Sequence, residues 1–177
     1  MAEPRTLFTS ALVERTLVRI AHEISERNEN SREVVLVGIH RGGVHLANRL
    51  KVTLESIWQH RVPTGELDVT MHRDDLDKHP APEMRVTSIP FDITGKVVVL
   101  VDDVLFSGRT TRAALDALND FGRPEVVQLA VLIDRGHRQL PIRADFIGKN
   151  VPTSLQERIQ VSLREDGLED SVTIEKL

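Results

Sequence analysis

Three short apolar runs constrain the fold of this chain more than any other feature. They are rich in β-branched residues, and they occupy residues 34–39 (VVLVGI), 97–104 (VVVLVDDV) and 126–133 (VVQLAVLI). Nearly continuous apolar strands of this length are typical of a parallel sheet that is covered on both faces. Segments with helical patterning alternate with them, which predicts βαβ units. We therefore predict an α/β fold with a central, mostly parallel sheet flanked by helices.

The remaining elements follow from the same patterns. Apolar residues at helical spacing predict helices over 10–27, 45–51 and 109–121, and alternation predicts a further strand over 66–72. After residue 133 the pattern changes to short strands and turns. We expect one domain over 1–177, with a core over about 10–133 and a small C-terminal hood and tail over about 134–177.

Composition excludes several classes of protein. The 177 residues include no cysteine, which excludes a disulfide scaffold, a thiolate zinc site and cysteine catalysis. No apolar run approaches the roughly 20 residues that span a bilayer, and the charged N-terminus lacks the apolar segment of a secretory signal. A formal charge of -4 argues against a general nucleic-acid binder. We expect a soluble cytoplasmic protein that makes no membrane contact.

The end of the second apolar run carries the most informative chemistry. Two adjacent carboxylates, Asp102 and Asp103, precede a short loop with Ser107 and Gly108 that opens a helix. Free N–H groups at a helix N-terminus, together with hydroxyls and a permissive glycine, form an anion cradle. Carboxylates accept hydrogen bonds from a sugar diol or hold a hydrated Mg²⁺ ion. This combination predicts a site for a 5-phosphoribosyl group, because ligands bind at the carboxyl ends of parallel strands.

The same segment resembles a known motif. VLVDDVLFSGRTTRAAL is similar to the motif that binds phosphoribosyl pyrophosphate (PRPP) in type I phosphoribosyltransferases. HRDDL, IPFDITGK and DRGHRQLPIRADFIGKNVPTS resemble the PyrR family, pyrimidine-operon attenuation regulators that are also uracil phosphoribosyltransferases. The resemblance covers nearly the whole chain, and the segment 134–154 is its most specific part. It implies a type I phosphoribosyltransferase-like fold with a C-terminal hood.

The resemblance assigns the ribose and 5′-phosphate of PRPP to ten consecutive residues, namely Asp102, Asp103, Val104, Leu105, Phe106, Ser107, Gly108, Arg109, Thr110 and Thr111. The simpler interpretation is that the acidic pair and the hydroxyls only cap the helix. Two carboxylates at the end of an apolar strand are costly unless something binds them. We therefore favour the binding role.

Two further loops are implied to contact the pyrophosphate group. The first is the loop His40, Arg41, Gly42 and Gly43, which departs from the commoner PyrR form because its arginine lies one position earlier. The second is a flexible loop that includes Arg73, Asp74 and Arg85 and closes over PRPP in the family. A long polar loop inside a compact domain is itself suggestive of function.

The base and the metal are assigned by resemblance as well. Arg135 is implied to contact uracil, and Ile159 to contact it through its backbone. The family requires Mg²⁺, which we expect to be bound through PRPP and water, with Asp102 and Asp103 as the protein's contribution.

RNA is the other implied partner, because PyrR dimers bind stem-loop RNA on a basic face. Its candidate residues here are Arg15, Arg19, Arg138, Arg143 and Lys149. A solvated surface of mixed charge explains the composition equally well. The resemblance favours RNA binding and implies a homodimer or a larger homo-oligomer.

These observations lead to one expected function and two alternatives. We expect a uracil phosphoribosyltransferase that converts uracil and PRPP to UMP and diphosphate and regulates a pyrimidine operon by UMP- or UTP-dependent binding to leader mRNA. One alternative is an RNA-binding nucleotide sensor with little catalysis. The other is a purine phosphoribosyltransferase, against which the PyrR-like segment 134–154 argues.

Overall fold

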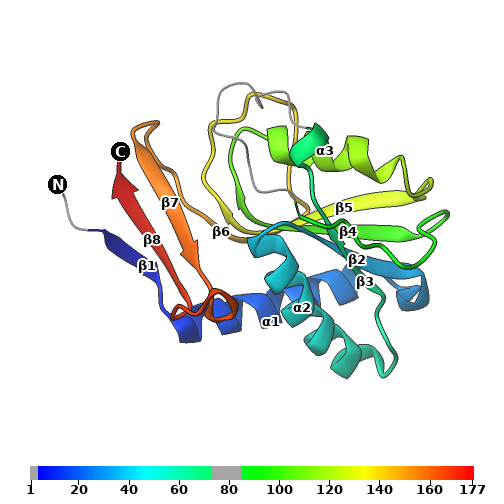
Figure 1. Ribbon diagram of the computed structural model, residues 1–177. Helices are drawn as coiled ribbons and strands as arrows, with labels where there is room; N and C mark the ends of the chain where they lie inside the picture. The colour runs from blue at the N-terminus through cyan, green and yellow to red at the C-terminus, as the bar shows by residue number, and fades with distance from the viewer. Residues whose placement is uncertain (1–3, 73–84) are drawn as a thin grey trace.

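The computed structural model describes residues 4–72 and 85–177, which form two separate β-sheets (Figure 1). The larger sheet has five strands in the order β3-β2-β4-β5-β6, and every neighbouring pair is parallel. Its strands are β2 (Val34–Ile39), β3 (Thr64–Leu67), β4 (Val97–Leu105), β5 (Val126–Asp134) and β6 (Phe146–Asn150). The expected α/β fold with a parallel sheet is confirmed.

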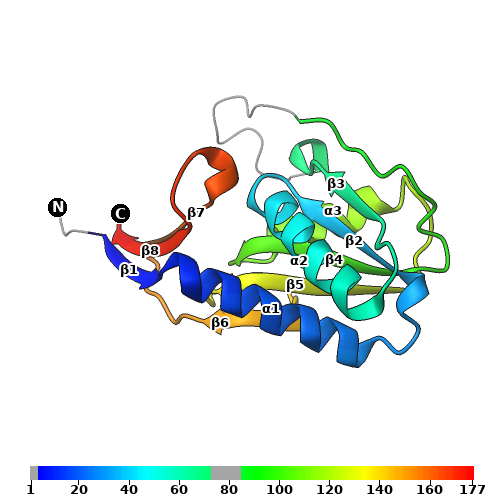
Figure 2. The same ribbon diagram turned by 90° about the horizontal axis from the view of Figure 1, so that it is seen from below.

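Helices cover both faces of this sheet, as the continuous apolar strands require. Helices α1 (Ser10–Arg27) and α2 (Gly42–Trp58) pack on one face, and α3 (Arg109–Leu118) packs on the other (Figures 1 and 2). Alternate β4 residues serve the two faces, since Val99 and Val101 join the core under α1 and α2 while Val98 and Leu100 join the core under α3. Among the helices of the described residues, none is both long and apolar enough to cross a membrane.

The smaller sheet forms the hood. It is antiparallel, with the order β1-β8-β7, and consists of β1 (Arg5–Phe8), β7 (Glu157–Ser162) and β8 (Ser171–Lys176). A single turn of 3₁₀ helix, η4 (Arg164–Asp166), connects β7 to β8. The start of the chain therefore pairs with its end, as the ribbon shows on the side of the molecule away from α3 (Figure 1).

The division between core and hood differs from the expected one. Strand β6 lies after residue 133 but completes the core sheet beside β5, and β1 precedes residue 10 but belongs to the hood. The crossover from β5 to β6 contains no helix, so it lacked the periodic signal that marks the other crossovers. A four-residue edge strand such as β1 has too few positions for a pattern to be recognised.

Several element boundaries also differ. Helix α2 begins at Gly42 and continues to Trp58, where Gln59 ends it with a left-handed backbone at φ 57°. Strand β3 ends at Leu67 because the carboxylate of Asp68 accepts hydrogen bonds from the N–H and hydroxyl of Thr70. These bonds turn the chain into the 3₁₀ turn η2 (Thr70–His72). A further 3₁₀ turn, η1 (Ser31–Glu33), precedes β2.

The topology determines where a ligand can bind. The chain passes from β2 outward to β3, and from β4 in the opposite direction to β5 and β6. Strands β2 and β4 are neighbours, so the crevice beyond their carboxyl ends is the topological switch point of the sheet. A Cβ atom on Gly43 would lie 2.2 Å from the carbonyl oxygen of Val101, so only glycine lets α2 begin this close to β4.

Charged side chains connect the hood to the core. Arg49 of α2 donates two hydrogen bonds to Glu165, at 2.7 and 2.5 Å, and two to Asp170, at 2.6 and 2.8 Å. Asp170 is only 3% exposed, and it also accepts the backbone N–H of Arg164. The hydrogen bonds from Arg49 lower the pKa of both carboxyl groups below their ordinary values, although burial opposes this. We call Arg49, Glu165 and Asp170 the hood anchor.

Removing the cation of the hood anchor should destabilise the protein strongly. Arg49→Met leaves the carboxylate of Asp170 buried without its partner, which typically costs about 3–5 kcal/mol. The control is Arg164→Met, because Arg164 forms a largely exposed ion pair with Glu14 at 3.3 Å, worth about 0–1 kcal/mol. Urea denaturation at neutral pH measures both losses. Equal losses in the two variants would contradict a structural role for the hood anchor.

The same anchor should make stability depend on acid pH. The folded-state pKa values of Glu165 and Asp170 lie below their unfolded values, so their contribution is present above pH about 4 and disappears as the pH falls through the folded-state values. The stability difference between the wild type and Arg49→Met should therefore be largest near neutral pH and shrink below pH about 4. Urea denaturation at several pH values measures this, and a difference that grows toward acid would be the contrary result.

Candidate functional site

The acidic pair lies within the last part of β4, at the switch point. Asp102 Oδ1 accepts the N–H of Asp103 at 2.9 Å, and Asp103 Oδ1 accepts the N–H of Val104 at 2.7 Å. Both carboxylates are thus oriented by the backbone of the strand that carries them. Asp102 is only 7% exposed, so it is buried rather than on an open surface.

Asp103 reaches across the crevice to the loop that follows β2. A Cβ atom on Gly42 would lie 2.5 Å from Asp103 Oδ2, so the missing side chain of Gly42 makes room for this carboxylate. Burial raises the pKa of Asp103 above its ordinary value, against hydrogen bonds that lower it, and the negative charge of Asp166 raises it further. The glycine that departs from the commoner family pattern therefore has a steric reason in this chain.

The loop after β4 is the segment for which we predict an anion cradle. Gly108 has a left-handed backbone at φ 90° and is the N-cap of α3, and Arg112 makes the first helical hydrogen bond back to it at 2.9 Å. The N–H groups of the first turn have no helical acceptor, as at every helix start. The side chain of Ser107 accepts the N–H of Arg109 at 3.3 Å, while its carbonyl accepts the N–H of Gln139 at 2.9 Å. The crossover toward β6 thus holds the loop in place.

The other residues of the predicted PRPP segment differ in exposure. Val104 and Leu105 pack against the two cores, and Phe106 is 37% exposed. Thr110 is half-buried, whereas Thr111 is buried and its hydroxyl has no hydrogen-bond partner among the described residues. All ten residues lie together at the carboxyl end of β4 and the start of α3.

A cationic cavity lies beside the loop that follows β2. Its volume is about 250 Å³, and its lining residues are His40, Arg41, Asp68, Thr70 and Arg85. The His40–Arg41 peptide bond in its wall is cis. His40 Nε2 is buried and lies 3.3 Å from Glu66 Oε2 without hydrogen-bond geometry. The cavity combines two arginines and a histidine with a single carboxylate, which suits an anionic ligand.

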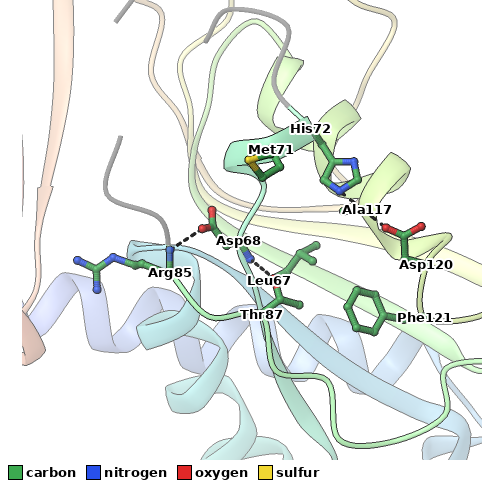
Figure 3. Close-up of a pocket in the computed structure, with 9 residues that line it drawn as sticks. All are labelled: Leu67, Asp68, Met71, His72, Arg85, Thr87, Ala117, Asp120 and Phe121. Carbon is green, nitrogen blue, oxygen red and sulfur yellow. Dashed lines mark hydrogen bonds and ion pairs between the residues drawn. The ribbon is translucent and has the colours of Figure 1, made fainter. Parts of the chain in front are cut away.

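A second cavity adjoins the first at the end of β3. Its volume is about 270 Å³, and Asp68 and Arg85 line both cavities. The N–H of Arg85 donates to Asp68 Oδ2 at 2.6 Å, and Figure 3 shows Met71, His72 and Phe121 on the other side of Asp68. Burial acts to raise the pKa of Asp68, but hydrogen bonds from Thr70 and Arg85 outweigh it, so the pKa lies below its ordinary value. Asp68 thus stays ionised and positions the backbone of Arg85 at the crevice.

The predicted base-contacting residues lie on the hood side of the crevice. Arg135 is 7% exposed, stacks at 4.1 Å from the ring centroid of Phe106, and donates to Thr153 Oγ1 and the Ser154 carbonyl, both at 3.1 Å. Its burial lowers the pKa of the guanidinium below its ordinary value. Ile159 of β7 points into the apolar core, which leaves its backbone for any contact with a ligand.

The predicted RNA-contacting residues are not equivalent. Arg19 pairs with Glu23 and donates to the carbonyls of Ile147 and Gly148, so it fastens α1 to β6. On the α3 side, Arg143 lines a cavity, and Arg138 contacts the carbonyls of Phe106 and Ile142 and the carboxylate of Asp134. On the α1 side, Arg15 is exposed, and Lys149 lies 5.6 Å from the ring centroid of Phe8. The structure does not bring all five together.

The structure also brings residues to the candidate site that the sequence analysis missed. Asp166 of the hood pairs with Arg41 at 2.8 Å, and Asp68 organises both cavities. Asp68 could have been found as a polar residue directly after a strand, whereas Asp166 had no signal in its acidic segment REDGLED. Arg73 and Asp74 lie outside the described residues.

Comparison with known proteins identifies the class. The family described as "Phosphoribosyl transferase domain" matches residues 8–158. A Trypanosoma cruzi hypoxanthine phosphoribosyltransferase of known structure shares the fold, with a TM-score of 0.74 at 17% identity over 99% of this chain and 97% of that one. The fold and the family match thus define a phosphoribosyltransferase, which confirms the expected fold class.

More similar relatives define the particular family. The "Bifunctional protein PyrR" of Chloroflexus aurantiacus is 58% identical over 98% of this chain and 97% of its own. That of a Roseiflexus species is 63% identical over 92% of this chain and 90% of its own. This chain therefore belongs to the PyrR family, as its sequence motifs indicated.

Proposed function

We propose that this protein transfers the 5-phosphoribosyl group of PRPP to uracil, giving UMP and diphosphate, and that it regulates a pyrimidine operon by nucleotide-dependent binding to leader mRNA in the cytoplasm. Membership of the PyrR family supports both activities. One structural observation carries the catalytic part. An acidic pair, a hydroxyl-bearing helix N-terminus and a cationic cavity all lie at the carboxyl ends of the neighbouring strands β2, β3 and β4.

Each part of the crevice suits one part of PRPP. Asp102 and Asp103 accept hydrogen bonds from the two ribose hydroxyls through their carboxylate oxygens. The N–H groups and hydroxyls of Ser107–Thr111 receive the 5′-phosphate at the start of α3. Arg41, Arg85 and the N–H groups around Gly42 receive the diphosphate. Arg135 and the backbone of Ile159 meet the base from the hood.

Mg²⁺ fits this arrangement. Asp102 and Asp103 offer hard carboxylate oxygens beside the diphosphate cavity, and Mg²⁺ near phosphates is usually held by one or two carboxylates plus substrate and water. The ion would neutralise the diphosphate as it leaves. The protein's own residues act by holding the ribose and aligning the base, and by opposing positive charge at the anomeric carbon with the acidic pair. This chemistry requires no covalent nucleophile.

The acidic pair should be essential for turnover. Asp102→Asn with Asp103→Asn removes the charge while keeping the shape, so UMP formation and PRPP affinity should fall at least about 100-fold, the usual cost of losing electrostatic stabilisation, without unfolding. The assay measures UMP from radiolabelled uracil with Mg²⁺ and PRPP, with hypoxanthine and orotate as parallel substrates.

Asp116→Asn is the matched control, because Asp116 lies on the exposed side of α3 and pairs with Arg112 at 3.7 Å. Its activity should equal that of the wild type. Near-normal turnover in the double variant would remove the acidic pair from the mechanism. Wild-type protein that binds UMP but turns over no base would favour the nucleotide-sensor alternative, and turnover of hypoxanthine in place of uracil would favour the purine enzyme.

The RNA-binding part of the proposal concerns the face shared by α1 and β6. Arg15 and Lys149 supply basic side chains on these adjacent elements, which Arg19 links through its hydrogen bonds to β6. Phosphate contacts from such residues give affinity that falls with salt. Arg19 is a poor choice for mutation, since its loss would also loosen α1 from β6.

Arg15→Ala with Lys149→Ala should therefore weaken leader-RNA binding and reduce its dependence on salt concentration, by about one unit of log–log slope for each RNA phosphate that is no longer neutralised. UMP synthesis should be unchanged. The charge-matched control is Arg32→Ala with Arg123→Ala, two exposed arginines that precede strands β2 and β5 and lie outside α1 and β6. Filter binding at several salt concentrations measures both, and equal effects in the two double variants would contradict the assignment of this face.

A further inference from the structure

The hood supplies a carboxylate to the loop that follows β2. Asp166 Oδ1 accepts a hydrogen bond from Arg41 Nη2 at 2.8 Å and lies 3.5 Å from His45 Nε2. Asp166 is 125 residues away from Arg41 in the chain, and its turn, drawn in red-orange in Figure 2, lies near the start of α2. Nothing in the ribose, phosphate or base assignments above uses Asp166.

Arg41 needs such a partner because of where it lies. Its side chain is 59% exposed, and it forms part of the wall of the 250 Å³ cationic cavity. A long exposed side chain samples many rotamers, and fixing it on ligand binding costs conformational entropy. The contact with Asp166 fixes the guanidinium in the wall of the cavity before any ligand arrives.

The contact leaves Arg41 able to bind an anion. The guanidinium has five N–H donors, and among the described residues only Nη2 has a partner. The remaining donors are available for phosphate oxygens, which arginine binds through its planar fork. Asp166 and a diphosphate can thus hold Arg41 together, and the ion pair is compatible with binding.

Asp166 is itself held in place by the hood anchor. Its neighbour Glu165 takes two hydrogen bonds from Arg49, and Asp170 takes two more, so both sides of this turn are fixed to α2. The hydrogen bond from Arg41 lowers the pKa of Asp166 below its ordinary value, so the carboxylate is ionised at neutral pH. The chain of contacts runs from Arg49 through the turn to Asp166 and then to Arg41.

We propose that Asp166 is a positioning residue that holds Arg41 in place for the diphosphate group of PRPP. This inference rests on the proposed function, because it takes the cavity beside Arg41 as the diphosphate site. It makes the hood part of the PRPP site, in addition to its role toward the base. It also explains how an arginine displaced by one position in the loop reaches the ligand.

The test compares ligands with and without a diphosphate in the full-length protein. Asp166→Asn keeps the shape of the side chain but loses its charge, so the affinities for PRPP and for inorganic diphosphate should fall about threefold to fivefold. The affinity for UMP, which has no diphosphate, should stay unchanged. Isothermal titration with Mg²⁺ present measures all three.

Two further variants complete the design. In an Arg41→Ala background, Asp166→Asn should have no additional effect on PRPP affinity, because Asp166 acts through Arg41. Glu169→Gln is the matched control, since Glu169 is exposed on the same turn and has no ion pair or hydrogen bond with another described residue. It should bind all three ligands like the wild type.

Several results would overturn the inference. Tighter PRPP binding by Asp166→Asn would make Asp166 a competitor of the diphosphate, and an equal loss of UMP affinity would make its role merely structural. A loss that persists in the Arg41→Ala background, or that high Mg²⁺ abolishes, would mean that Asp166 acts on something other than Arg41. Failure of the proposed function is distinguishable, because the wild type would then bind no PRPP.

Discussion

The site depends on a close backbone approach between the start of α2 and the end of β4. Gly43 lies against the carbonyl of Val101, and Gly42 lies against the carboxylate of Asp103, at distances that leave no space for a Cβ atom. Two consecutive glycines therefore let a helix begin directly over the switch point. This close approach brings the loop that we propose for the diphosphate of PRPP next to the carboxylates that we propose for its ribose. A side chain at position 43 would push α2 away from the backbone of β4, and one at position 42 would displace the carboxylate of Asp103.

The hood is joined to this core both by apolar packing, through residues such as Ile159 and Val172, and by charge. Arg49, Arg41 and His45 project from α2 and the loop before it, and they meet Glu165, Asp166 and Asp170 on one turn of the hood. Ion pairs are directional and sensitive to geometry, so they fix the orientation of the hood more strictly than an apolar contact of the same area would. Asp170 is almost fully buried, so its pairing is also a condition for stability. The same set of contacts thus serves both the fold and the position of Arg41.

The core of the fold was predictable from sequence because its signals are local. Runs such as VVLVGI have a period and composition that identify buried strands, and α1 follows its helical stripe from Ser10 to Arg27 as predicted. The hood and its boundary with the core were harder to predict from sequence. Strand β1 pairs with β8, which lies at the other end of the chain, and β6 follows a crossover that contains no helix. Asp102 and Asp103 were identifiable as two carboxylates after an apolar run. Asp166 was not, because its importance comes from Arg41, a partner that no local pattern indicates.

A chain with a net charge of -4 must separate its charges locally if it is to bind a substrate as anionic as the proposed one. The structure achieves this by occupying its carboxylates with its own donors. Asp68 accepts from Thr70 and Arg85, Asp103 accepts from the N–H of Val104, and Asp166 accepts from Arg41. Each bond reduces the repulsion that the carboxylate exerts on an approaching phosphate, because the negative charge is already solvated by fixed dipoles or a cation. Arg41 and Arg85 then determine the electrostatic potential of the cationic cavity. For Arg41, the carboxylate of Asp166 both compensates the positive charge and fixes the direction of the side chain.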